Sequence, residues 1–165
     1  MTRRATHSVA HAFLVETYAT ESLKTLSVWS QVEATDFEWR IEPRARTPHE
    51  HMVHQCVSED AWMRTMLGID AGQPALPALE SRSAFIEHYS AASSRRLAAL
   101  SAHDDAWYSE SARVFDAERT RAWILVRRFV HSAHHRGQLT TILRARGHAL
   151  WSTYGPTADT GGLFQ

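Results

Sequence analysis

The sequence has only one cysteine, Cys56, among its 165 residues. A lone cysteine cannot form a disulfide within the chain, which is typical of proteins from reducing compartments. No segment approaches the roughly 18 consecutive apolar residues that a transmembrane helix needs. The basic N-terminus also lacks the apolar stretch of a secretory signal. We therefore expect a cytoplasmic protein without a membrane-bound segment.

Net charge is also absent, because 18 acidic residues balance 18 basic ones. A chain without an overall electric field attracts neither nucleic acid nor anionic lipid, so we expect no nucleic-acid partner. The hydrophobic content of 44% is ordinary for a globular protein. The length corresponds to about one domain, and we expect a single domain over residues 1–165.

Four long segments have helical periodicity, and together they predict an all-α four-helix bundle. They cover about residues 7–32, 47–68, 81–101 and 118–146. The spacing of the apolar residues predicts that these side chains face the core: Val9, Phe13, Leu23, Leu26 and Trp29 in the first segment, and Trp123, Val126, Val130 and Leu139 to Leu143 in the last. A short extended stretch is expected near residues 112–115. The tail after residue 150 is expected to be irregular and folded back onto the bundle.

The start of the second helix has the clearest local signal. Thr47 is followed by Pro48 and, three residues after the threonine, by Glu50. This is a capping box with proline at the first helical position. Gly68 is the predicted end, because glycine readily takes the left-handed conformation that terminates helices.

The segment "HSAHHRGQL" (residues 131–139) has three histidines in five positions. His131 and His135 are four residues apart, so on a helix both project from one face and can bind one ion. His134 is rotated away from them, and could support such a site from behind or pack on a neighbour. Gly137 in mid-helix suggests close approach of another backbone or of a ligand. Gln138 could orient water or a bound ligand. For Arg136, a surface position is the simplest expectation.

A metal site needs at least one more protein ligand, and the second helix offers several. His49 and His51 lie in its first turn, which we expect to be near solvent. His54 lies one turn further along, and periodicity modestly favours it over His51. The carboxylates of Glu59 and Asp60 are alternatives, although such residues usually face solvent. His51 is also a candidate acid or base, while Cys56 is expected to be an inert buried side chain.

Two segments resemble motifs of the DinB/YfiT-like family. "HSAHHRGQLTTILRARG" (131–147) is similar to its C-terminal signature, a histidine followed after three residues by "HRGQ". "RARTPHEHMVHQCVSEDAWM" (44–63) is similar to an earlier block, in which glutamate follows a histidine by five residues. That glutamate is Glu59 here, which selects His54. The resemblance implies a bundle of up-down-down-up topology and one divalent metal, nickel or zinc, on His54, His131 and His135.

The same resemblance implies a metal-dependent transferase that uses a small-molecule thiol and an electrophilic substrate. A metal-dependent hydrolase is the alternative, and a non-enzymatic protein in which the metal staples the helices is a third possibility. Gln138 and His51 are the candidate catalytic residues. A homodimer is possible. Ligands with ordinary histidine pKa values would release the metal as the pH falls below about 6.5.

Overall fold

The computed structural model describes residues 10–162, and within them four long helices form a bundle. These are α1 (Ala12–Trp29), α2 (Pro48–Leu67), α3 (Arg82–Ala102) and α5 (Arg121–Ala145). Between α3 and α5 lie a short helix α4 (Asp105–Ser109) and two strands, β1 (Ser111–Val114) and β2 (Ala117–Thr120); the tail contains a 3₁₀ helix η1 (Ala158–Thr160). No helix in this part of the chain is long and apolar enough to cross a membrane.

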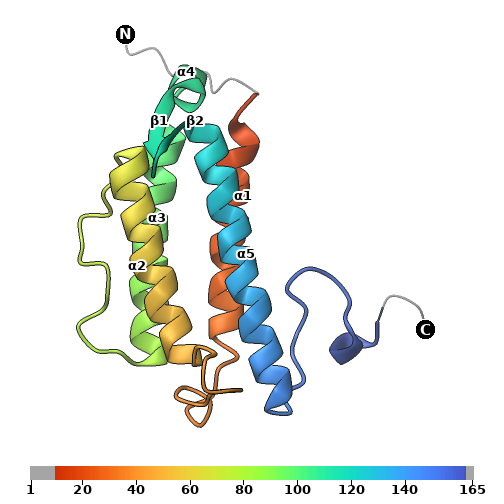
Figure 1. Ribbon diagram of the computed structural model, residues 1–165. Helices are drawn as coiled ribbons and strands as arrows, with labels where there is room; N and C mark the ends of the chain where they lie inside the picture. Colours follow the sequence, from red (N-terminus) through yellow and green to blue (C-terminus); the bar gives the residue numbers. More distant parts are fainter. Residues whose placement is uncertain (1–9, 163–165) are drawn as a thin grey trace.

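The helices follow the expected up-down-down-up order (Figure 1). The parallel pair α2 and α3 is joined by the long connection 68–81, which runs back along the bundle, and α1 and α5 share the opposite direction. Helix α1 packs against both α3 and α5, and α2 packs against α5. Because α2 and α5 are antiparallel neighbours, the histidine-bearing parts of both helices can meet in the groove between them.

The local signals at the ends of α2 are confirmed. The Thr47 side chain accepts a hydrogen bond from the Glu50 backbone, and the Glu50 carboxylate accepts one from the Thr47 backbone. Gly68 ends the helix with a left-handed φ of 70°. These contacts satisfy backbone groups that the helix ends would otherwise leave unpaired. They fix the start of α2 one turn before His51.

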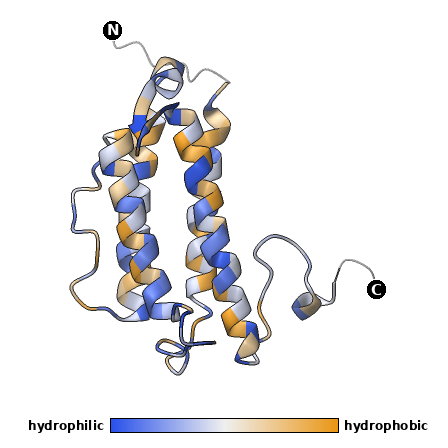
Figure 2. Ribbon diagram, viewed as in Figure 1, coloured by the Kyte–Doolittle hydropathy of each residue, from blue (hydrophilic) through white to orange (hydrophobic). Residues whose placement is uncertain are grey.

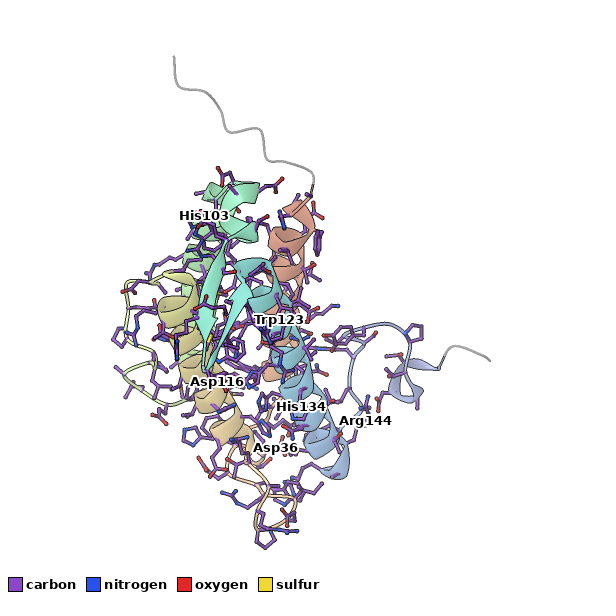
Figure 3. The ribbon with its side chains drawn as sticks, turned by 45° about the horizontal axis from the view of Figure 1, so that its top comes forward. Asp36, His103, Asp116, Trp123, His134 and Arg144 are labelled. Carbon is purple, nitrogen blue, oxygen red and sulfur yellow. The ribbon has the colours of Figure 1, made fainter. Side chains whose placement is uncertain are left out.

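The extended stretch near residues 112–115 is also confirmed, as one strand of an antiparallel hairpin. Its partner strand takes residues 117–120, so the last helix begins at Arg121 and not at residue 118. The hairpin turn, marked by Asp116 in Figure 3, lies along the bundle, and β1 contacts α2. The hairpin therefore covers part of the groove above the histidines.

The predicted apolar stripes of the first and last helices are only partly confirmed. In the last helix Leu139, Ile142 and Leu143 are buried as predicted. Phe13, Leu23, Trp123, Val126 and Val130 are all exposed. Trp29 is buried as predicted and Leu26 packs at the edge of the core, whereas Val9 lies outside the described residues. The faces that turn inward lie a position or two away from the predicted ones. The prediction counted only apolar residues, whereas the buried faces also contain polar side chains. On α1 these are Leu14, Tyr18, Ser22, Thr25 and Val28; on α5 they include Ile124, Leu125, Arg128, Ser132 and His135.

The core consists of two hydrophobic clusters with a polar layer between them. One cluster is nearer the hairpin and includes Leu14, Met63, Leu100 and Ile124. The other is nearer the opposite end and includes Trp29, Met52, Phe85 and Leu139. Figure 2 shows a hydrophilic stretch along the middle of α5, with more hydrophobic residues toward both of its ends. This arrangement places the polar segment of α5 at mid-height in the bundle.

Glu59 of α2 is the centre of the polar layer and is only 1% exposed. The hydroxyls of Tyr18 and Tyr89 donate to its two carboxylate oxygens at 2.7 and 2.8 Å. The guanidinium groups of Arg96 and Arg128 each lie 3.4 Å from it. Burial alone would raise the pKa of Glu59, but the two arginines and two tyrosines outweigh burial and hold that pKa below its usual value.

The expectation that Glu59 and Asp60 face solvent is therefore wrong. Asp60 is also buried and pairs with Arg96 at 3.3 Å. Both carboxylates are used in ion pairs within the bundle, where a buried charge needs a partner of opposite sign.

We predict that Glu59→Gln lowers the free energy of unfolding by about 3–5 kcal/mol, because it leaves two buried arginines without their shared anion. Urea denaturation of the purified variant measures this loss. Glu118→Gln, on the exposed strand β2, is the matched control and should change stability by less than about 0.5 kcal/mol. Equal stability of the two variants would show that the layer does not depend on this carboxylate.

Candidate metal centre

Three histidines converge at the edge of the polar layer. Nε2 of His131 lies 3.4 Å from Nε2 of His54 and 3.2 Å from Nε2 of His135. All three ligand atoms lie within 4.8 Å of one another. Thus α2 supplies one imidazole and consecutive turns of α5 supply two, the combination that the sequence motifs indicate.

The spacing of these nitrogen atoms fits one shared ion. Metal–nitrogen bonds of about 2.0–2.1 Å in tetrahedral geometry separate two ligand nitrogens by about 3.3 Å. The two Nε2 separations at His131, 3.4 and 3.2 Å, match this value. Three imidazoles are the protein ligands of a site that keeps a position open for water or substrate.

Gln138 orients one of the three rings. Nδ1 of His135 donates to Oε1 of Gln138 at 3.0 Å, one turn further along α5. The ring proton is then on Nδ1, which leaves the lone pair of Nε2 directed at the other two histidines. Such a contact to the second ring nitrogen is how metal-binding histidines are usually held.

Arg128 contacts His131 in a different way. Its Nη1 lies 2.8 Å from Nδ1 of His131. Because a guanidinium only donates, Nδ1 must accept, and the ring proton is then on Nε2. A neutral His131 that binds metal through Nε2 carries its proton on Nδ1, so this contact has to change when an ion binds. Arg128 also donates to Ser58 at 3.0 Å and pairs with Glu59, and these partners would retain it.

The histidines of the site are held in their neutral form. Burial, followed by the charge of Arg128, lowers the pKa of His131 to about 4. Burial, followed by the neighbouring histidines, lowers the pKa of His135 to about 3. Burial and then Arg46 lower the pKa of His54. Neutral imidazole is the form that binds metals, so at pH 7 these rings can bind an ion without first being deprotonated.

His51 is not near solvent, contrary to the sequence-based expectation. It is 2% exposed, and its ring lies 5.5 Å from that of His135. The first turn of α2 is covered because the preceding loop folds over it. Burial, followed by the charge of Arg46, lowers the pKa of His51 to about 4. His49 is only partly exposed, and its two ring nitrogens face Glu38 and Glu80.

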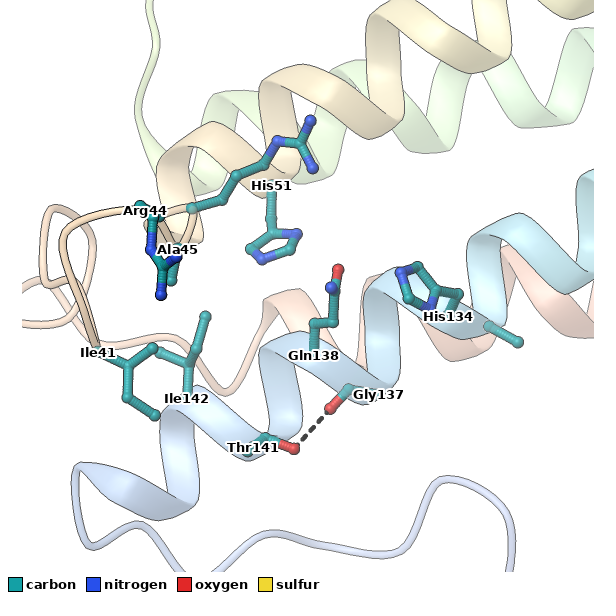
Figure 4. A pocket seen from close by; sticks show the side chains of 11 residues that line it. Ile41, Arg44, Ala45, His51, His134, Gly137, Gln138, Thr141 and Ile142 are labelled. Atoms are coloured by element: carbon teal, nitrogen blue, oxygen red, sulfur yellow. Dashed lines mark hydrogen bonds between the residues drawn. The ribbon is translucent and has the colours of Figure 1, made fainter.

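A pocket of about 820 Å³ adjoins the histidines on the side of His51 and Gln138. These two side chains point toward each other from α2 and α5 (Figure 4). His134 is exposed, and it lines the same pocket with its ring 5.1 Å from that of His135. The volume is within the range of small-molecule sites.

Two aromatic side chains cover the other side of the site. The ring of Trp62 is stacked at 6.2 Å from that of His131, and Phe115 contacts the edge of Trp62 at 6.0 Å. Phe115 is in the hairpin turn with a positive φ of 53°, a conformation usually left to glycine. The sequence offered no signal for this contact, because it depends on how the hairpin lies on α2.

The structure also corrects the expectation for Arg136 and one of the two alternatives for Gly137. Arg136 is buried, and it donates to Thr25 at 3.0 Å and pairs with Glu21 of α1. Its other partner is the hydroxyl of Tyr154, in the tail that folds back onto the bundle as predicted. At Gly137, a Cβ atom would meet no other described group within 4 Å, so close approach of another backbone is wrong. Close approach of a ligand stays a prediction, and Gly137 lines the pocket. Cys56 is buried as predicted, and burial raises the pKa of its thiol to about 12.

A second group, Glu33, Asp36 and His148, also brings possible ligand atoms together. Here the carboxylate of Asp36 already accepts hydrogen bonds from Arg146 at 3.0 Å and from the Glu33 backbone at 3.0 Å, and it pairs with His148 at 2.9 Å. With these partners it joins the end of α5 to the loop after α1. We interpret this group as an ion-pair cluster.

We predict about one divalent ion per chain in tag-free wild-type protein, and its loss in His54→Ala and in His131→Ala, because each substitution removes one of three ligands. Elemental analysis after dialysis against zinc or nickel measures this. His49→Ala, on the same helix but outside the three-histidine group, is the control and should retain the ion. Retention in His54→Ala together with loss in His51→Ala would identify a different third ligand.

We predict that zinc affinity stays level between pH 7 and about 5 and falls only as the pH approaches about 4, because protons compete for imidazole near and below its pKa. This corrects the expectation of release near pH 6.5, since burial lowers the pKa of His131 to about 4. Competition against a chelator of known pH dependence measures the affinity. A short histidine peptide with ordinary pKa values is the control. A tenfold loss between pH 7 and 6 would contradict the prediction.

Comparisons with known proteins agree with the fold and the motifs. The crystal structure of a DinB-like protein from Bacillus cereus has a TM-score of 0.73 and 18% sequence identity, with 87% of this chain and 95% of that chain covered. A DinB-like protein from Bacillus subtilis, YjoA, has a TM-score of 0.70 and 14% identity over 87% and 99% of the two chains. At these identities the similarity shows a shared fold.

A third solved structure, YfiT from Bacillus subtilis, is described as a probable metal-dependent hydrolase with an unusual four-helix bundle topology. Its TM-score is 0.67 at 15% identity, with 92% of this chain and 95% of that chain covered. No protein with a curated description matches the sequence. The family model of the DinB family matches residues 3–161, almost the whole chain, and the chain therefore belongs to the DinB family.

Proposed function

We propose that this protein binds one divalent metal ion, zinc or nickel, on His54, His131 and His135 and transfers a group to a small-molecule thiol. The observation that carries the proposal is the convergence of three imidazole nitrogens beside an open pocket of about 820 Å³. Imidazole ligands suit zinc and nickel among the common divalent metals. A divalent ion at this place would lower the pKa of a water or a thiol that reaches it.

The surrounding residues would keep the ligands in place and limit the access of water. Gln138 fixes the ring of His135, and Trp62 is stacked over His131. The pocket on the other side is large enough for the reactive parts of two small molecules. Holding a thiol and an electrophile side by side removes much of the entropic cost of their encounter.

The lining of the pocket favours a thiol over water as the nucleophile. Hydrolysis benefits from a base near neutral pKa that accepts a proton from water. Among residues 10–162, those that line the pocket include no carboxylate. His51 is a weak base, because burial and Arg46 lower its pKa to about 4. A thiol depends less on a nearby base to lose its proton, since its ordinary pKa of about 8.5 is already close to neutral.

Hydrolysis is the second candidate function, and the description of YfiT as a probable metal-dependent hydrolase supports it. The third possibility is a metal that only staples α2 to α5, which would be expected of a site closed by a fourth protein ligand. Among the described residues, the group around His131 contains three possible ligands and adjoins a pocket. This favours an enzyme over a structural staple.

We predict that zinc- or nickel-loaded protein accelerates the reaction of monobromobimane with at least one thiol in a panel that includes cysteine and glutathione. The sulfur would form a bond to the carbon of the probe, with release of bromide and a proton. His131→Ala should lower the rate at least about a hundredfold, since ligand loss removes the ion. His49→Ala is the control and should stay near wild type.

A parallel assay with 4-nitrophenyl acetate and no thiol separates the two enzymatic candidates. Metal-dependent ester hydrolysis without thiol transfer would favour the hydrolase. If the loaded protein catalyses neither reaction with these panels, the structural staple becomes the better account of the three histidines.

A further inference from the structure

The pocket beside the histidines has an uneven distribution of charge. Its polar lining includes two arginines, Arg44 and Arg46, and two histidines, His51 and His134, but no aspartate or glutamate. The chain as a whole is neutral, so this local excess of cationic side chains is a property of the site. A concave surface with charge of one sign raises the local concentration of ligands of the opposite sign.

Arg46 is the cation that remains available. Its neighbour Glu50 already uses one carboxylate oxygen for Arg40, at 2.7 Å, and the other for the backbone N–H of Thr47, at 2.9 Å. Among residues 10–162 the structure shows no ion pair or hydrogen bond of the Arg46 guanidinium. Its side chain lines the same pocket as His51 and Gln138.

The loop that carries Arg46 is held against α2. Arg40 donates to the carbonyl of Ala45 and pairs with Glu50, and Thr47 forms the capping box. These contacts restrict the loop on both sides of Arg46. Both arginines are exposed, the Arg44 side chain to 92%, but Arg44 pairs with Glu42, whereas Arg46 has no partner among residues 10–162. We therefore expect Arg46 to contribute more than Arg44.

His51 adds a buried polar atom without a partner. Its Nδ1 is enclosed, since the residue is only 2% exposed, and it makes no hydrogen bond with any described residue. A buried polar atom that lacks a partner is costly unless a water or ligand satisfies it. The ring lines the pocket opposite Gln138 (Figure 4). Oε1 of Gln138 accepts from His135, and its amide nitrogen makes no hydrogen bond with a described residue and can donate to a ligand.

We propose that this pocket binds the oxyanion of a small-molecule substrate, a carboxylate or a phosphate, with Arg46 as its main anchor and with Gln138 and His51 as further contacts. A guanidinium offers two parallel N–H donors that match both oxyanions. The anion would hold the substrate with its reactive part toward His135. This inference rests on the proposed function, because it assigns a substrate class to the same site.

Isothermal titration calorimetry of the metal-loaded protein tests the proposal with succinate, phosphate and the neutral analogue succinamide. We predict that succinate or phosphate binds and succinamide does not. Arg46→Ala should weaken this binding at least about fivefold, and Arg46→Lys should weaken it less, because lysine keeps the charge but not the paired donors. Whichever of the two anions binds more tightly identifies the chemical source of the oxyanion.

Arg119→Ala is the matched control, because it removes the same charge from the exposed strand β2 at the hairpin end of the bundle. It should change the dissociation constant less than about twofold. The proposal is overturned if neither anion binds at concentrations up to about 10 mM, if succinamide binds equally well, or if Arg46→Ala matches wild type.

Metal content and thiol transfer are measured on the same samples, so the two proposals can fail separately. Intact metal binding and transfer without anion binding would reject only the oxyanion site. Anion binding that depends on Arg46, in a protein that transfers nothing to thiols, would reject only the proposed reaction.

Discussion

The buried carboxylate of Glu59 is the interaction on which the rest of the structure depends. A negative charge in the middle of a helical bundle is tolerated only where donors and opposite charges surround it. Here the donors come from three other helices: Tyr18 from α1, Tyr89 and Arg96 from α3, and Arg128 from α5. One residue of α2 thereby sets the register of the other three long helices. The hydrophobic clusters on either side stabilise the bundle, but apolar contacts alone do not specify such a register.

The three histidines lie at the border of this polar layer. Arg128 connects them to it, since the same guanidinium contacts Glu59 and the ring of His131. Eight residues after Arg128 on α5, Arg136 pairs with Glu21 of α1, and the tail residue Tyr154 also contacts this guanidinium. The polar middle of α5 is therefore held from both neighbouring helices. A rigid frame of this kind keeps ligand side chains close to the geometry that one ion requires.

Local signals allowed the helix ends and part of the candidate site to be predicted from sequence. The capping box at Thr47 and the terminating Gly68 depend on contacts within a few residues, so the sequence contains all the information needed. The pairing of His131 with His135 follows from helical spacing, whereas spacing alone left His51 and His54 open as the third residue. Resemblance to the family selected His54, and the structure places it with the other two.

What could not be predicted depends on partners that are distant in the sequence. A glutamate or an arginine is normally placed at the surface, and only the tertiary structure shows that Glu59, Arg128 and Arg136 neutralise one another or their neighbours inside the bundle. The burial of paired charged residues also explains why the first part of the predicted apolar stripe on α5 is wrong. Trp123, Val126 and Val130 look like a buried face only if charged residues are assumed to lie outside, and Arg128 instead takes the inward position.

The charges around the site also bear on the kind of ligand it would accept. Glu59 and Asp60 are matched by Arg96 and Arg128, so the polar layer carries no free anion toward the histidines. The three histidines are neutral at pH 7, because burial lowers their pKa values. A divalent ion held by neutral ligands keeps its full charge, and Arg46 adds another positive charge nearby. An anionic ligand would offset both, and this applies equally to a thiolate and to the oxyanion that we propose. The described lining of the pocket contains arginines and histidines but no aspartate or glutamate, and this favours negatively charged substrates there.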